Sequence, residues 1–86
     1  MQKTNLYRPM VLHRLAATER HIEQGERHIV RQREVVETLE RDGRGQSDTS
    51  KVAREVLHSY ELSQAAHAKE RDFLLKALIE APASKE

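Results

Sequence analysis

Apolar side chains recur at a spacing of seven residues through the first half of the chain. One row consists of Leu15, Ile22, Ile29 and Val36. A second row is apolar only at its ends and consists of Val11, Thr18, Gly25, Gln32 and Leu39. Because seven residues make about two turns of an α-helix, both rows lie on one helical face. The pattern predicts a helix over residues 9–42, beginning at Pro9, whose missing N–H is harmless in a first turn.

A short polar segment, residues 43–48, follows this helix. Gly43 suits the left-handed residue just past a helix end, and Gly45 adds a second break. Ser47, Asp48 or Thr49 can then cap a second helix. That helix is expected over residues 49–81, because Pro82 ends it. Residues 1–8 remain as a flexible N-terminus and residues 82–86 as a frayed tail of this single domain.

The second helix has a less distinct apolar face. Its expected inward positions are Ala53, Val56, Tyr60, Ser63, His67, Glu70, Leu74 and Ala77. The short connection predicts an all-α fold, an antiparallel two-helix hairpin with long helices. A single unbroken helix is the alternative, which the two glycines and the capping residues disfavour. The expected pairing sets Leu39 opposite Ala53 and Gly25 opposite His67, with apolar ends and a polar or small-residue middle.

Composition favours association of such hairpins. The chain is 37% hydrophobic and 34% charged, with one Phe and no Trp, which is typical of long helices and coiled coils. Two helices meet along one seam only, so a monomer leaves apolar residues near the open end uncovered. These residues are Met10, Leu12, Phe73, Leu75, Leu78 and Ile79. We therefore expect a homodimer that forms a four-helix bundle, with a further protein partner as an additional possibility.

Several function classes are disfavoured by the sequence. The net charge is +1 and charges of both signs are interspersed, so no basic surface for nucleic acid is expected. No apolar run approaches the roughly 20 residues of a membrane span, and the N-terminus lacks the apolar core of a secretion signal. With no Cys, a cytoplasmic location is the expectation. No nucleophile elbow or phosphate-binding loop occurs, so we expect neither catalysis nor a cofactor.

The histidines are the first candidates for chemistry. Glu-Arg-His-Ile occurs twice, placing His21 and His28 about 10 Å apart along one helix, too far for one metal ion to bind both. Glu55 and His58 have the Glu-x-x-His spacing of di-metal helical bundles. The second such motif is missing, so we expect no metal site at Glu55 and His58.

A second candidate lies in the expected polar middle. Gly25 would leave room for His67, and Glu70 would lie beside that imidazole. A buried imidazole near a carboxylate would respond to pH, and a histidine in a helical bundle can also accept a phosphoryl group. The favoured interpretation of Gly25, His67 and Glu70 is a polar layer that fixes helix register and oligomeric state.

Three segments together resemble a group of short bacterial proteins. They are the repeated "ERHI", the segment "RQRE" followed by "LERDG", and a second-helix ending of the form HxxxRDxLL, here "HAKERDFLL". The likeness covers roughly residues 12–78. It implies a bacterial family with this hairpin pattern, and it carries over no site residue and no activity.

The leading hypothesis is a non-catalytic, cytoplasmic helical-hairpin module that self-associates. The competing hypothesis is a metal- or pH-responsive helical bundle that uses Glu55 with His58, or His67 with Glu70.

Overall fold

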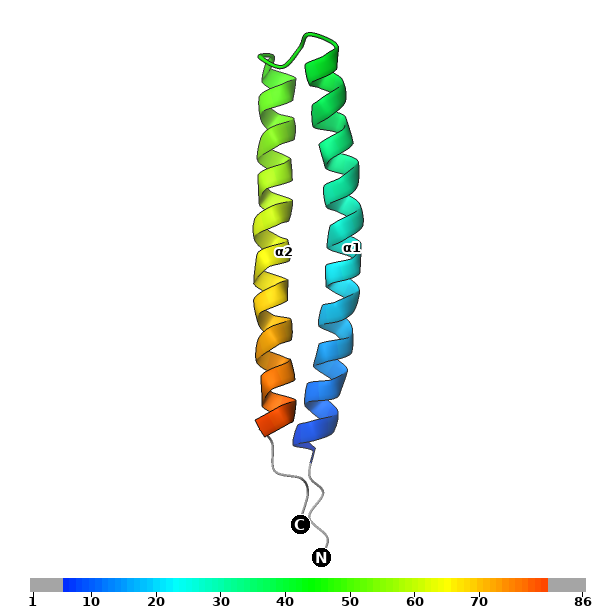
Figure 1. The fold of residues 1–86 in the computed structure, drawn as a ribbon, viewed down its shortest axis with the longest axis vertical. Coiled ribbons are helices and arrows are strands. Elements are labelled where there is room, and N and C mark those ends of the chain that lie inside the picture. Colours follow the sequence, from blue (N-terminus) through cyan, green and yellow to red (C-terminus); the bar gives the residue numbers. More distant parts are fainter. Residues whose placement is uncertain (1–5, 81–86) are drawn as a thin grey trace, which may run out of the picture.

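Two long helices lie side by side and antiparallel (Figure 1). The computed structural model describes residues 6–80. Helix α1 spans Tyr7–Arg41 and helix α2 spans Asp48–Glu80. The predicted all-helical hairpin is therefore confirmed, with α1 beginning two residues before the predicted start. Residues 1–5 and 81–86, which hold most of the predicted N-terminal segment and the predicted tail, lie outside the described residues.

A local hydrogen-bond motif ends α1 at Arg41, one residue before the predicted end, and Gly43 is the left-handed residue that the sequence predicts. Gly43 has a φ of 77°, in the left-handed region. The Gly43 N–H donates to the Glu40 carbonyl at 3.1 Å, and the Arg44 N–H donates to the Leu39 carbonyl at 2.9 Å. These two bonds form a Schellman motif, which satisfies carbonyls left without a partner at the end of the helix.

The start of α2 is also fixed by hydrogen bonds between residues close in sequence. The Ser47 hydroxyl oxygen accepts a hydrogen bond from the Ser50 N–H at 3.1 Å and donates to the Arg44 carbonyl at 2.7 Å. The Ser47 carbonyl accepts the first helical bond, from the Lys51 N–H at 3.1 Å. Of the three possible capping residues, Ser47 therefore caps the helix.

Ser50 and Arg54 tie this turn to α1. Ser50 is completely buried, and its hydroxyl oxygen accepts a hydrogen bond from Arg54 Nη1 at 2.9 Å. The same nitrogen donates to the Gly45 carbonyl at 3.0 Å and lies 3.8 Å from a Glu40 carboxylate oxygen. One arginine thus joins the loop to both helices.

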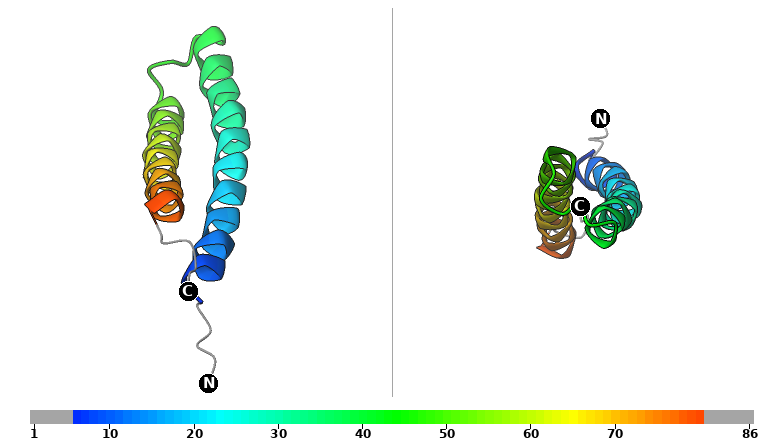
Figure 2. Two further views of the ribbon diagram at one scale, coloured as in Figure 1. Left: turned by 60° about the horizontal axis from the view of Figure 1, so that its bottom comes forward. Right: turned by 90° about the horizontal axis from the view of Figure 1, so that it is seen from above.

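The seam of α1 follows the predicted seven-residue rows. Its inward residues, all buried or half-buried, are Val11, Leu15, Thr18, Ile22, Gly25, Ile29, Gln32, Val36 and Leu39. Their alternating spacing of four and three residues is that of a coiled-coil seam. The two helices stay adjacent over their whole length, as the views in Figure 2 show.

The seam of α2 differs from the prediction in one of its two rows. Its inward residues are Ser50, Ala53, Leu57, Tyr60, Gln64, His67, Arg71, Leu74 and Leu78. The predicted row through Val56, Ser63, Glu70 and Ala77 lies one position away, on the edge of the seam, and Ser63 is exposed. Leu57 and Leu78 bury more apolar area than Val56 and Ala77 would, which favours the observed phase.

The clusters of fully buried apolar residues lie at the two ends of the seam. Near the loop, Val36, Leu39 and Ala53 form one buried cluster, against which Leu57 packs. At the open end, where α1 begins and α2 ends, Val11, Leu15 and Leu74 form the other. Between the clusters the seam consists mainly of half-buried or polar residues. This polar middle is where the sequence and the structure place the candidate site.

Gly43→Ala should lower the free energy of unfolding by about 1 kcal/mol, because an L-residue with a side chain is strained at positive φ. Denaturant unfolding followed by circular dichroism measures the change. Gly45→Ala is the matched control, since a Cβ there would make an ordinary contact with Glu40 Cγ at 3.5 Å. An equal loss at both positions would contradict the assignment of the left-handed turn to Gly43.

Candidate functional site

Gln64 crosses the seam at its midpoint and contacts the main chain of α1. Its Nε2 donates a hydrogen bond to the Ile22 carbonyl at 2.8 Å. A Cβ at position 25 would overlap the Gln64 Oε1 and would lie 2.8 Å from its Cδ. Gly25 is therefore required for this approach, but for a different reason from the predicted one. Gln64, not His67, occupies the space that the glycine leaves.

A second glutamine makes the reciprocal contact nearer the loop. Gln32 Nε2, on α1, donates to the Ala53 carbonyl of α2 at 2.9 Å. Each glutamine thus hydrogen-bonds to the main chain of the opposite helix. Because these carbonyls sit at fixed heights along the helices, the two bonds favour one relative register of α1 and α2.

Two pairs of aromatic rings span the seam beside Gln64. The imidazoles of His21 and His67 have centroids 5.2 Å apart with planes inclined at 35°. His28 stacks on Tyr60, also at 5.2 Å, with planes inclined at 13°. The four rings, with Gln24, Gly25, Ser63 and Gln64, line a groove of about 250 Å³. His21 and His28 are exposed, whereas His67 and Tyr60 are half-buried.

The predicted placement of Glu70 beside the His67 imidazole is wrong. Glu70 accepts a hydrogen bond from Arg14 Nε at 2.7 Å, in an ion pair at the edge of the seam. His67 faces His21 across the seam. Glu55 and His58 are both exposed on α2. Within residues 6–80, no group of three or more His, Asp or Glu side chains is arranged to hold a metal ion.

The apolar residues predicted as an interface fall on two sides of the seam. Met10 and Phe73 line a groove of about 380 Å³ at the open end, together with Tyr7, Val11, Arg14, Glu70 and Leu74. Leu12 and Leu75 follow Val11 and Leu74 in sequence, so they lie about 100° further round each helix, on the opposite side. Leu78 does not belong to the exposed set, because it packs against the buried cluster.

We name the two sides of the seam by their composition. The histidine flank contains the residues that immediately precede the inward positions, and the charged flank contains those that immediately follow them. The histidine flank contains three residues of the types Asp, Glu, Lys and Arg, namely Arg14, Arg31 and Glu70. On the charged flank they are Glu19, Glu23, Glu26, Arg33, Glu37, Glu40, Lys51, Arg54, Glu61 and Asp72.

Ion pairs confirm that each flank runs along both helices. Arg33 Nη2 lies 3.4 Å from a Glu61 carboxylate oxygen, joining two positions of the charged flank. Arg14 and Glu70 join two positions of the histidine flank. Both pairs are partly exposed, so each contributes little to stability. The two pairs show which residues of α1 and α2 lie on the same face of the hairpin.

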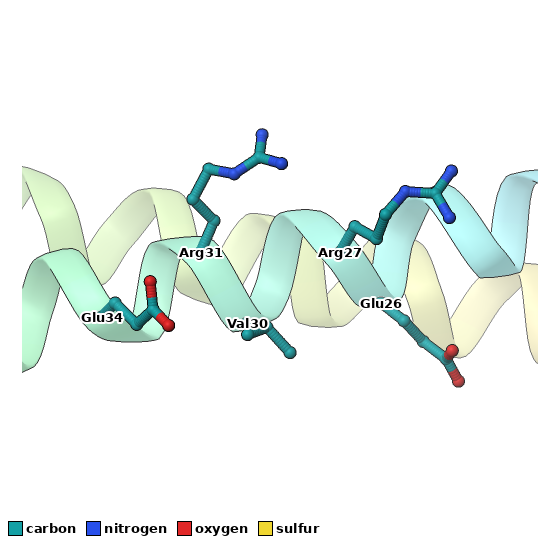
Figure 3. A pocket seen from close by; sticks show the side chains of 5 residues that line it. All are labelled: Glu26, Arg27, Val30, Arg31 and Glu34. Atoms are coloured by element: carbon teal, nitrogen blue, oxygen red, sulfur yellow. The ribbon is translucent and has the colours of Figure 1, made fainter.

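A further hollow lies on the outside of α1. Figure 3 shows its five lining residues, Glu26, Arg27, Val30, Arg31 and Glu34. All five belong to α1 and are exposed, and the arginine side chains extend away from the helix (Figure 3). With no second element to close it, this surface does not enclose a ligand, and the groove beside Gln64 is the better candidate.

Comparisons with known protein families, with curated proteins and with solved structures gave no significant match. The resemblance to short bacterial proteins therefore stays a prediction from the sequence. Over the residues that the structure describes, neither helix has an apolar stretch long enough to cross a membrane.

Sequence reasoning missed Gln64, Gln32 and the contact between His21 and His67. Gln32 and Gln64 occupy seam positions in rows that have large apolar residues near their ends, and that was the available signal. A polar residue on such a row must find a hydrogen-bond partner when the helices close over it. The histidine pair depends on the register, which differs by about one turn from the predicted pairing at Gly25.

Gly25→Ala should leave the free energy of unfolding nearly unchanged in the native sequence. The gain of about 1 kcal/mol in helix propensity is offset by displacement of Gln64 and loss of its hydrogen bond. In a Gln64→Ala background the overlap is gone, and the same substitution should stabilise the protein by about 1 kcal/mol. Denaturant unfolding of the four proteins at one concentration measures the difference. Equal effects in both backgrounds would mean that position 25 does not contact Gln64.

Proposed function

We propose that the chain is a non-catalytic, cytoplasmic interaction module that self-associates through its histidine flank, so that two hairpins form a four-helix bundle. The observation that carries this proposal is the contrast between the flanks. Charged groups crowd one side of the seam, whereas the other side has few along its whole length. Depletion of charge is the compositional mark of an interface core.

The histidine flank also has exposed apolar side chains that a partner would cover, although the charged flank has others, at Leu12, Val30, Leu75 and Ile79. Phe73 is 70% exposed and Met10 is 64% exposed, and both line the groove at the open end. Val52 and Val35 extend the apolar character toward the loop, at 56% and 44% exposure. Apolar groups spread along a flank of about 50 Å suit another long helix pair better than a compact protein.

The limited core of a single hairpin gives an independent reason for a partner. Its buried apolar residues are Val11, Leu15, Val36, Leu39, Ala53 and Leu74, in two separate clusters. Most helical stability in proteins comes from packing of an apolar face, not from helix propensity. A second copy would cover the histidine flank and join the two clusters into one core. In a symmetric dimer the same flank serves both subunits, so self-association needs no second type of surface.

The competing function, a bundle responsive to metal or pH, has no support at Glu55 with His58 or at His67 with Glu70. Glu55 and His58 are exposed, and Glu70 is paired with Arg14. A different protein that occupies the histidine flank is the remaining alternative. It would leave the isolated chain monomeric, so the mass of the purified protein distinguishes it from self-association.

The purified protein should sediment as a dimer of about twice its 10.0 kDa chain mass at micromolar concentration. Phe73→Glu should weaken the dimer at least about tenfold, because it places a charge in the contact. Leu75→Glu is the matched control: it lies two residues away on the charged flank, and the dimer should survive it. Analytical ultracentrifugation with circular dichroism gives mass and helix content together.

A well-folded monomer at every concentration would overturn the proposed self-association. A dimer broken by Leu75→Glu and not by Phe73→Glu would move the interface to the charged flank.

A further inference from the structure

The His21 and His67 side chains meet across the seam, one from each helix. Their ring centroids are 5.2 Å apart. A tetrahedral Zn²⁺ with Zn–N bonds of about 2.0 Å places the centroids of two imidazole ligands about 5 Å apart. The separation of the two rings is therefore compatible with one shared metal ion.

A second observation in the same groove also points to a ligand. Gln64 lines the groove, and its Oε1 is buried with no hydrogen-bond partner within the described part of the chain. Such an unsatisfied acceptor in a folded protein calls for an ion or a water molecule. This oxygen is sealed from solvent and packs into the space left by Gly25, so it can accept a hydrogen bond from a metal-bound water only after the Gln64 side chain shifts.

The groove lining identifies the class of cation. It contains three imidazoles, a phenol, a hydroxyl and two amides, and no carboxylate. Ca²⁺ and Mg²⁺ prefer carboxylate and carbonyl oxygens, whereas imidazole nitrogen suits Zn²⁺, Cu²⁺ and Ni²⁺. His28 faces the phenol of Tyr60, whereas His21 faces the imidazole of His67, so the second contact is the one that brings two imidazoles together.

We propose that the hairpin binds one divalent transition-metal ion, represented by Zn²⁺, between His21 and His67. Water completes the coordination, and a shift of the Gln64 side chain lets its Oε1 accept a hydrogen bond from that water. The ion joins α1 to α2 in the polar middle, where apolar packing is weakest. The expectation of no metal site rested on the spacing of His21 with His28 and of Glu55 with His58, whereas the pair of His21 and His67 depends on the register of the two helices.

The site belongs to a single hairpin and does not depend on the proposed self-association. Two protein ligands bind more weakly than the four of a structural zinc site, so the protein folds without the ion and gains stability with it. Because His21 lies on the histidine flank, a dimer packed through that flank would enclose one such site per chain.

The test is a titration of ZnCl₂ into the metal-free full-length protein, followed by calorimetry and by thermal unfolding. We expect one ion per chain, and a rise in Tm of about 5 °C at saturation that excess chelator reverses. His21→Ala and His67→Ala should each abolish the rise. His13→Ala and His58→Ala are the controls, since both histidines are exposed outside the groove, and both variants should keep it.

Three outcomes would overturn the proposal. They are the absence of binding, a loss of binding in the control variants equal to that in His21→Ala, and binding that occurs only as metal bridges two molecules. Repeating the titration on Phe73→Glu separates the last case from the proposal, because an ion held within one chain binds the monomer as well. His21 is exposed, so His21→Ala tests the ligand without removing a buried contact.

Discussion

The contact between Gln64 and the main chain of α1 at Gly25 sets the middle of this hairpin. Apolar clusters hold the two ends, but the segment between them has no apolar cluster that favours one register over another. Two hydrogen bonds favour one register over the others. One runs from Gln64 to the Ile22 carbonyl, and the other runs from Gln32 to the Ala53 carbonyl. The ring pairs and the edge ion pairs follow from that register. A single missing side chain, at Gly25, thus decides which histidines meet.

The sequence predicts α1 more accurately than α2, and the reason is physical. In α1 both seam rows repeat with large apolar residues at the ends, so only one face can be buried. In α2 one row, through Ala53 and Leu74, is shared by two possible seams. The second row then had to be chosen between Val56 and its neighbour Leu57, which differ by one position. Periodicity alone does not resolve such a choice, because adjacent rows are only about 100° apart.

The candidate site was less predictable than the fold. The sequence indicates a polar middle and a reason for Gly25, but a glutamine has no spacing signal of its own. The contact of His21 with His67 joins residues that are far apart in the chain, and an error of one turn removes it. The division of the surface into two flanks, in contrast, follows directly from the sequence once the inward residues are known. Residues that precede them are mostly neutral, and residues that follow them are mostly charged.

The self-contained turn between the helices has a consequence for the order in which the hairpin forms. Gly43 and Ser47 close the connection with bonds that span only a few residues, and the nearby cluster of Val36, Leu39 and Ala53 joins segments close in sequence. Closing such a short loop loses little chain entropy, whereas the cluster of Val11, Leu15 and Leu74 must bring distant segments together. We therefore expect the helices to zip from the turn toward the termini, and we expect amide protons near the open end to exchange fastest with solvent. The groove of Met10 and Phe73 sits at that late-forming end, where docking of a second chain would complete the folding reaction.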